Sequence, residues 1–89
     1  MKALDILKVF GKNLRKYRNE KSLSQEKFAE ICNLHRTYIS DIERGQRSIA
    51  LGNVQKIADA LKIETYKLFL ENENDENYKL FLENENDEN

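Results

Sequence analysis

The stretch from Ser24 to Gly45, SQEKFAEICNLHRTYISDIERG, constrains the fold of this chain more than any other. It predicts two short helices joined by a tight turn. Ser24 is a good N-cap for the first helix, because its hydroxyl can accept from a free N–H of the first turn. Asn33 tolerates the left-handed conformation that ends a helix, so we expect the turn to begin there. The apolar face of this helix is formed by Phe28, Ala29 and Cys32.

The second helix of the pair is expected from about Arg36 to Arg44, with Gly45 as its C-terminal stop. At about 100° per residue, Ile39 and Ile42 share one buried face. A helix this short is unstable alone in water, so the two isoleucines must hold it against the rest of the chain. The opposite side carries the hydrogen-bonding side chains of Thr37, Ser40, Asp41 and Arg44, with Arg36 at the N-terminal end and Tyr38 on a flank.

The whole run LSQEKFAEICNLHRTYISDIERG resembles the helix-turn-helix of the lambda-repressor-like (Cro/CI, or XRE) family. Its RTYIS-IERG portion is similar to the restriction–modification controller proteins of that family. The resemblance covers about residues 10–70 and implies an all-α fold, a compact five-helix DNA-binding domain. It also implies an ion pair between Arg18 and Glu43 that ties the first helix to the reading helix. The alternative is an ordinary helical hairpin whose polar side is only solvated.

Apolar spacing outside this motif predicts three further helices. The first runs from about residue 3 to residue 20 and carries a stripe of Leu4, Leu7, Phe10, Leu14 and Tyr17. The fourth helix of the fold is marked by Leu51, Val54, Ile57, Ala58 and Leu61. Thr65 could cap a fifth helix that carries Leu68, Phe69 and Leu70.

The charge of the chain is divided between a basic body and an acidic tail, although its net charge is only −1. Residues 1–70 hold 14 Lys and Arg against 8 Asp and Glu, whereas residues 71–89 hold one Lys against 8 acidic residues. The tail contains the second copy of a twelve-residue repeat, YKLFLENENDEN, found at 66–77 and 78–89. We expect a helix-turn-helix domain over residues 1–70 and an acidic extension over residues 71–89. The apolar part of the second copy, Tyr78–Leu82, is expected to dock on the body or on a partner chain.

Composition argues against several other classes of protein. The single cysteine, Cys32, allows no internal disulfide and no cysteine metal cluster, and we expect it to be a small buried side chain. No apolar run approaches the ~18 residues of a membrane span, and residues 1–10 lack the features of a signal peptide. A cytoplasmic protein without membrane association is therefore expected. No catalytic set or phosphate-cradling glycine loop is visible, so neither enzyme activity nor a cofactor is expected.

These features predict a sequence-specific transcriptional regulator, a homodimer on a near-palindromic site in double-stranded DNA. The helix Arg36–Arg44 would read the major groove, with Arg36 the best candidate for a guanine contact. The candidate base contacts are Arg36, Thr37, Tyr38, Ser40 and Asp41. The candidate phosphate contacts are Ser24, Gln25, Arg44, Arg47 and Ser48. The dimer is expected to form through the fourth and fifth helices, near Asn53, Tyr66 and Leu70, which leaves the reading helix free.

A protein-interaction module, such as the antitoxin of a toxin–antitoxin pair, is the alternative hypothesis. In that case the YKLFL segments would bind a protein partner and DNA binding would be secondary. Recovery of a stoichiometric protein partner would favour the interaction module. Binding to palindromic DNA that weakens steeply with salt would favour the regulator.

Overall fold

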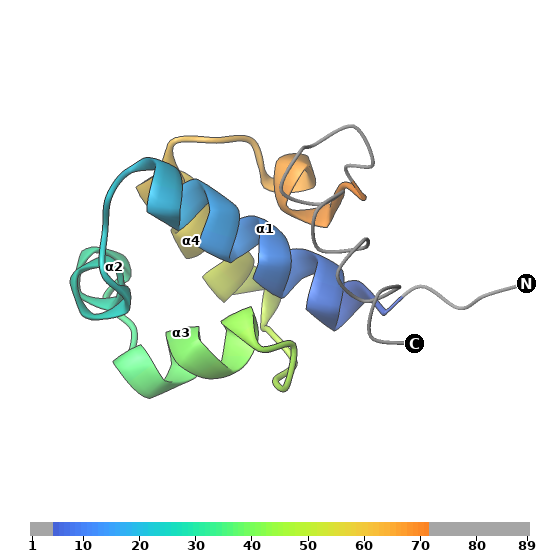
Figure 1. Ribbon diagram of the computed structural model, residues 1–89, viewed down its shortest axis with the longest axis horizontal. Coiled ribbons are helices and arrows are strands. Elements are labelled where there is room, and N and C mark those ends of the chain that lie inside the picture. Colours follow the sequence, from blue (N-terminus) through green and yellow to red (C-terminus); the bar gives the residue numbers. More distant parts are fainter. Residues whose placement is uncertain (1–4, 72–89) are drawn as a thin grey trace, which may run out of the picture.

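The computed structural model describes residues 5–71 of the 89-residue chain. This part contains no strand and consists of α1 (Ile6–Glu20), α2 (Gln25–Cys32), α3 (Arg36–Glu43), α4 (Leu51–Leu61) and a short 3₁₀ helix, η1 (Thr65–Phe69). α1 runs through the middle of the molecule, with α2 and α3 along one side, α4 behind it and η1 on the other side (Figure 1). α1 packs against α3 and η1, and α2 packs against α3 and α4. The all-α prediction is confirmed.

The predicted helix-turn-helix is present almost residue for residue. Ser24 is the N-cap of α2, and its Oγ accepts from the backbone N–H of Lys27 at 3.0 Å. Asn33 ends α2 in the left-handed conformation, with φ 58° and ψ 45°. α3 ends at Glu43, one residue before the predicted end, and Gly45 follows it with a φ of +71°. Both helix stops therefore follow from the local conformational preferences of Asn33 and Gly45.

The N-terminal helix begins later than predicted. α1 starts at Ile6 because Asp5 is its N-cap, and the Asp5 carboxylate accepts from the backbone N–H of Lys8 at 3.3 Å. Leu4 and the rest of residues 1–4 lie outside the described residues. So does the second repeat copy, and the docking expected for Tyr78–Leu82 stays a prediction.

The core lies between α1, the helix pair and α4. The helices contribute most of their predicted apolar faces, and η1 adds one side chain. Leu51 is an exception: it was predicted on the inner face of α4 but is 84% exposed. The buried hydrophobic residues are Phe10, Leu14, Phe28, Ala29, Cys32, Ile39, Ile42, Val54, Ile57, Ala58, Leu61 and Leu68. Burial raises the pKa of the Cys32 thiol to about 11, and the charge of Lys56 acts in the opposite direction. Cys32 is thus the small buried side chain that was predicted.

The predicted fifth helix is present as a short 3₁₀ helix, but its cap and its extent were predicted wrongly. The five residues Thr65–Phe69 form a 3₁₀ helix, so Thr65 is its first residue. Glu64, not Thr65, is the N-cap, and it makes no side-chain capping hydrogen bond. The buried Asn13 of α1 explains this geometry, because its Nδ2 donates to the carbonyl oxygens of Leu68 at 2.8 Å and Leu70 at 2.9 Å. Leu68 is fully buried, and the ring of Phe69 packs 5.2 Å from that of Phe10. The segment is therefore bent onto α1 instead of continuing as an α-helix.

α1 and α3 cross at Gly11. A Cβ atom on this residue would lie 2.3 Å from the carbonyl oxygen of Ile42 and 2.8 Å from that of Glu43. The close approach brings the C-terminal turn of α3 onto the backbone of α1. No helix in residues 5–71 is both long enough and apolar enough to cross a membrane.

Candidate nucleic-acid interface

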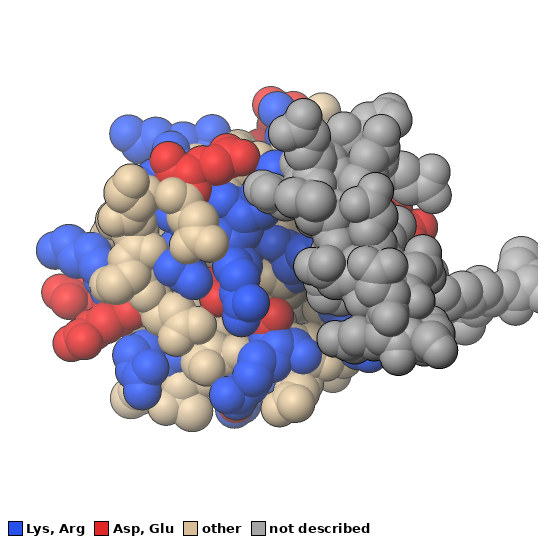
Figure 2. Space-filling model, in the orientation of Figure 1, with Lys and Arg blue, Asp and Glu red and all other residues tan. Residues whose placement is uncertain are grey.

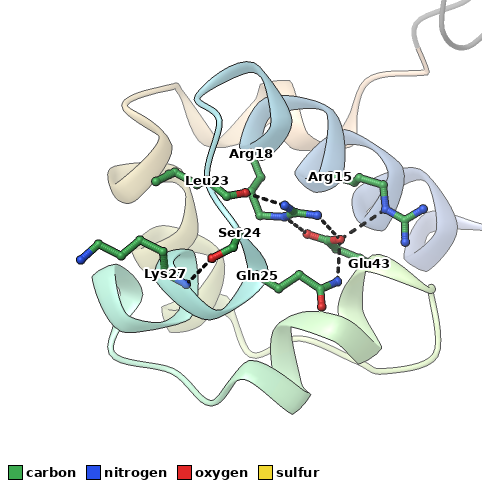
Figure 3. Close-up of polar contacts among 7 residues, drawn as sticks. All are labelled: Arg15, Arg18, Leu23, Ser24, Gln25, Lys27 and Glu43. Carbon is green, nitrogen blue, oxygen red and sulfur yellow. Dashed lines mark hydrogen bonds and ion pairs between the residues drawn. The ribbon is translucent and has the colours of Figure 1, made fainter.

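A buried carboxylate fixes α3 in place. Oε2 of Glu43 accepts from Nε of Arg18 at 2.6 Å, and Oε1 accepts from Nη2 of the same arginine at 2.9 Å (Figure 3). Nη1 of Arg18 donates to the carbonyl oxygen of Leu23 at 2.6 Å, between α1 and α2. Both Arg18 and Glu43 are buried. The ion pair implied by the family resemblance is confirmed, and it is bidentate, the strong form of this interaction.

Two further donors converge on the same carboxylate. Oε1 of Glu43 also accepts from Nε2 of Gln25 at 3.0 Å and from Nε of Arg15 at 3.3 Å. The sequence did not point to Arg15, although it lies on the same side of α1 as Arg18 (Figure 3). The amide nitrogen of Gln25 is directed at Glu43 here, so the predicted contact of Gln25 with phosphate stays a prediction.

The electrostatics of Glu43 favour its charged form. Burial by itself raises the pKa of this carboxyl, but other contributions outweigh burial and lower the pKa below its ordinary value. These are the hydrogen bonds from Arg18 and Gln25, the charge of Arg18, and the hydrogen bond from Arg15. The Glu43 carboxylate therefore remains ionised at neutral pH, and its hydrogen bonds hold α3 against both α1 and α2.

The outward surface of α3 carries the predicted polar side chains. Ile39 and Ile42 are fully buried, which confirms the predicted inner face. Arg36 and Thr37 are exposed, whereas the other three candidate base contacts, Tyr38, Ser40 and Asp41, are half-buried. Figure 2 shows Lys and Arg side chains over the middle of α1 and along the edge where α3 lies. Acidic side chains are interspersed among them, so the surface is mixed in charge.

A second polar cluster lies on the other flank of α3, around Asp41. Its Oδ1 accepts from Nη2 of Arg44 at 2.5 Å and its Oδ2 from Nη1 of Arg47 at 3.5 Å. The guanidinium of Arg47 lies 4.9 Å from the centre of the Tyr38 ring. The Tyr38 hydroxyl accepts from Nδ2 of Asn53 at 3.0 Å. These contacts join α3 to the connection that follows it and to the start of α4. The sequence did not predict them, because the partners come from three different segments.

A hollow of about 410 Å³ borders this cluster at the N-terminal end of α3. Its lining combines the turn before α3 with α3 itself, the following connection and α4. The lining residues are Asn33, Leu34, His35, Thr37, Tyr38, Arg47 and Asn53. The candidate base contacts Thr37 and Tyr38 therefore share one concave surface with the candidate phosphate contact Arg47.

The remaining candidate phosphate contacts lie at the two ends of the helix pair. Ser24 is exposed at the N-terminus of α2. Its hydroxyl oxygen accepts from Lys27, which leaves the O–H free to donate. Arg44, Arg47 and Ser48 are exposed at and after the end of α3. These groups flank the polar surface of α3 on both sides, as phosphate contacts that position a reading helix would.

Comparison with known proteins agrees with this geometry. Residues 14–68 match the model of the helix-turn-helix family. Control protein C.BamHI of Bacillus amyloliquefaciens is 54% identical over 57 residues, which cover 63% of this chain and 70% of that protein. The crystal structure of the restriction-modification controller protein C.AhdI from Aeromonas hydrophila is 48% identical with a TM-score of 0.69, and the match covers 71% of this chain and 96% of that one.

A third similar protein was crystallised together with DNA. The controller protein C.Esp1396I, crystallised as a tetramer in complex with its natural 35 base-pair operator, is 34% identical with a TM-score of 0.65. The match covers 72% of this chain and 84% of that one. These relatives favour a DNA-binding regulator over the antitoxin hypothesis, and they confirm the resemblance to restriction–modification controller proteins. With its matching family model, helix pair and buried ion pair, the chain belongs to the helix-turn-helix family.

Proposed function

We propose that this protein is a sequence-specific transcriptional regulator that reads the DNA major groove with α3 and binds a near-palindromic operator as a dimer. The observation that carries the proposal is the way α3 is held. Its apolar side and Glu43 are buried, while Thr37 on the opposite side and Arg36 at the N-terminal end of the helix are left exposed. The related C.Esp1396I, crystallised on its operator, supports the same role. The protein would act as a regulator and not as an enzyme, in the cytoplasm.

The exposed N-terminal end of α3 is proposed to contact base edges. Arg36 can donate two hydrogen bonds to O6 and N7 of one guanine, the commonest specific contact in the major groove. Thr37 follows it on the exposed surface, with Tyr38 and Ser40 at the margins. Asp41 lies on the same surface, but its two oxygens already accept from arginines. Phosphates would be bound by Ser24, Gln25, Arg44, Arg47 and Ser48.

The dimer is proposed to form through α4 and η1. Apolar side chains are exposed there without being used in the described fold, with Leu51 at 84%, Tyr66 at 55% and Leu70 at 47% exposure. An apolar hollow of about 150 Å³ lies beside them, lined in part by Leu51, Val54 and Phe69. Asn53, also predicted near the interface, is half-buried and donates to Tyr38. An interface here would connect dimerisation to the flank of the reading helix.

The domain boundary is proposed at residue 70. Residues 1–70 would form the helix-turn-helix domain, which is compact around five helical segments, the last being the 3₁₀ helix η1. Residues 71–89 would be an acidic extension that carries the second repeat copy. The described part of the first copy, residues 66–71, is part of the fold through Leu68 and Phe69.

Two arginine variants test the assignment of reader and phosphate contact. Arg36→Ala should weaken binding to a duplex selected from a random library by about 1–3 kcal/mol and relax the preference at one base position. Arg47→Ala should weaken binding to all sequences alike and reduce the slope of log K against log salt. Binding constants on selected and random duplexes, over a range of salt concentrations, measure both effects. Equal losses on both duplexes for Arg36→Ala would contradict its role as a reader.

A further inference from the structure

Asp41 holds two of the arginines that are proposed to contact phosphates. Arg44 and Arg47 are bound to its two oxygens, at 2.5 Å and 3.5 Å. The Asp41 side chain is 22% exposed, whereas the side chains of Arg44 and Arg47 are 53% and 52% exposed. The carboxylate thus lies partly beneath two guanidinium groups that face solvent. Carboxylates and phosphates are recognised by the same fork of guanidinium donors, so Asp41 occupies donors that DNA would also use.

The position of Arg47 is fixed from a second side. Its guanidinium lies over the Tyr38 ring, and the Tyr38 hydroxyl is held by Asn53 of α4. Each arginine uses one nitrogen on Asp41, Nη2 for Arg44 and Nη1 for Arg47. A guanidinium has five N–H donors, so the others can reach a phosphate without release from Asp41. Such a contact requires the phosphate to lie where the fixed guanidinium points.

We propose that Asp41 is a specificity-determining residue that acts by positioning Arg44 and Arg47 and does not need to contact a base. On the correct site, the phosphates meet the arginines in the positions that Asp41 imposes. Because these arginine side chains are already ordered, binding costs no further conformational entropy there. On a wrong site, the arginines must leave the carboxylate to follow a different phosphate register. Asp41 therefore weakens non-specific binding more than specific binding, in the way repulsive elements raise specificity. The inference rests on the proposed DNA-binding function.

Asp41→Asn tests the inference directly. The ratio of affinities for a selected and a random duplex should fall by roughly threefold to tenfold, as expected for the loss of two partly exposed ion pairs. Most of the change should be a gain in affinity for the random duplex. The matched control is Asp59→Asn, which changes the net charge equally on α4, where Asp59 accepts from Gln55 at 2.8 Å. The control should shift both affinities alike and leave their ratio unchanged. Thermal unfolding should be similar for both variants because the partners that each carboxylate loses, Arg44 and Arg47 or Gln55, are themselves exposed.

A double-mutant cycle distinguishes positioning from direct contact. In an Arg44→Gln/Arg47→Gln background, adding Asp41→Asn should leave the ratio of affinities unchanged, because the groups through which Asp41 acts are gone. An effect of the same size in that background, or a changed preference at one base position, would show that Asp41 contacts DNA itself and overturn the inference. Equal ratios for Asp41→Asn and Asp59→Asn would also overturn it. Failure of the unchanged protein to prefer any duplex would instead contradict the proposed function.

Discussion

Glu43 joins parts of the chain that lie far apart in the sequence. Its carboxylate accepts from Arg15 and Arg18 of α1 and from Gln25 of α2, while Glu43 itself is the last residue of α3. The side chain is completely buried, so removal of its charge would leave Arg18 without its partner in the interior. An uncompensated buried charge is among the most costly defects in a protein.

Glu43→Gln should lower the free energy of unfolding by about 3–5 kcal/mol at neutral pH. The pKa of Glu43 is lowered in the folded state, so its stabilisation is fully present above the unfolded value of about 4.3. It is lost as the pH falls through the folded pKa. The difference between the unchanged protein and Glu43→Gln should therefore be largest near pH 7 and shrink below about pH 4.3. Denaturant titrations from pH 7 to pH 3 measure this, with the exposed Glu30→Gln as control. A difference independent of pH would show that the charge of Glu43 is not the stabilising feature.

The contacts around Glu43 differ in how far they could be predicted from the sequence. Arg18 and Glu43 were predicted because the family resemblance carries the pair to these positions. Arg15 and Gln25 were not assigned to it, since each is a polar residue that could equally face solvent. Their role depends on how closely α1, α2 and α3 approach, which is a tertiary property. Asn13 was missed for the same reason: its two acceptors lie 55 and 57 residues away in the sequence.

At the scale of elements, the predicted helices were correct where local rules decide them. Capping by Ser24 and the left-handed Asn33 are encoded within a few residues, and the structure has both. The predicted fifth helix, with Thr65 as its cap and Leu70 within it, is instead a 3₁₀ helix over Thr65–Phe69. Its conformation is imposed from outside by Asn13, which binds two of its carbonyl oxygens and so competes with continued helical hydrogen bonding.

Gly11→Ala should destabilise the fold by about 1–3 kcal/mol, although alanine is the better helix former. The added Cβ would meet the backbone oxygens of Ile42 and Glu43, which cannot rotate away as a side chain can. Gly52→Ala in α4 is the matched control, because nothing lies within 4 Å of its Cβ position. It should be neutral or stabilising by up to about 1 kcal/mol. Urea denaturation measures the free energy of unfolding of both variants. A Gly11→Ala variant as stable as the unchanged protein would show that α1 and α3 can move apart without a loss of stability.

At the scale of the whole molecule, the repeat supplies a duplicate of one structural segment. Tyr78–Leu82 has the same sequence as Tyr66–Leu70, and the contacts of η1 with α1 use Leu68, Phe69 and main-chain carbonyls. The second copy could therefore replace the first on α1. The connection to α4 would be twelve residues longer, which costs roughly 1 kcal/mol of loop-closure entropy.

Leu68→Ala should consequently lower the free energy of unfolding less in the full chain than in a chain that ends at residue 77. In the shorter chain, loss of this fully buried side chain should cost about 2–5 kcal/mol. In the full chain, Leu80 can take its place, so the cost should be limited to about 1 kcal/mol. Leu61→Ala is the control, because this buried residue lies outside the repeat and should cost the same in both chains. An equal cost of Leu68→Ala in both chains would show that the second copy does not bind there.

The separation of roles on α3 has a consequence for how this protein can change its target. The side chains that anchor the helix are Ile39, Ile42 and Glu43, and the exposed positions Arg36 and Thr37 take no part in anchoring. Under the proposed function, substitutions at these exposed positions would therefore alter recognition without a loss of stability. Such a helix can diverge toward new sites one residue at a time, and its exposed residues could be exchanged between related scaffolds as a set. The connection through Asp41 limits this freedom, because it ties the recognition surface to the arginines beside it.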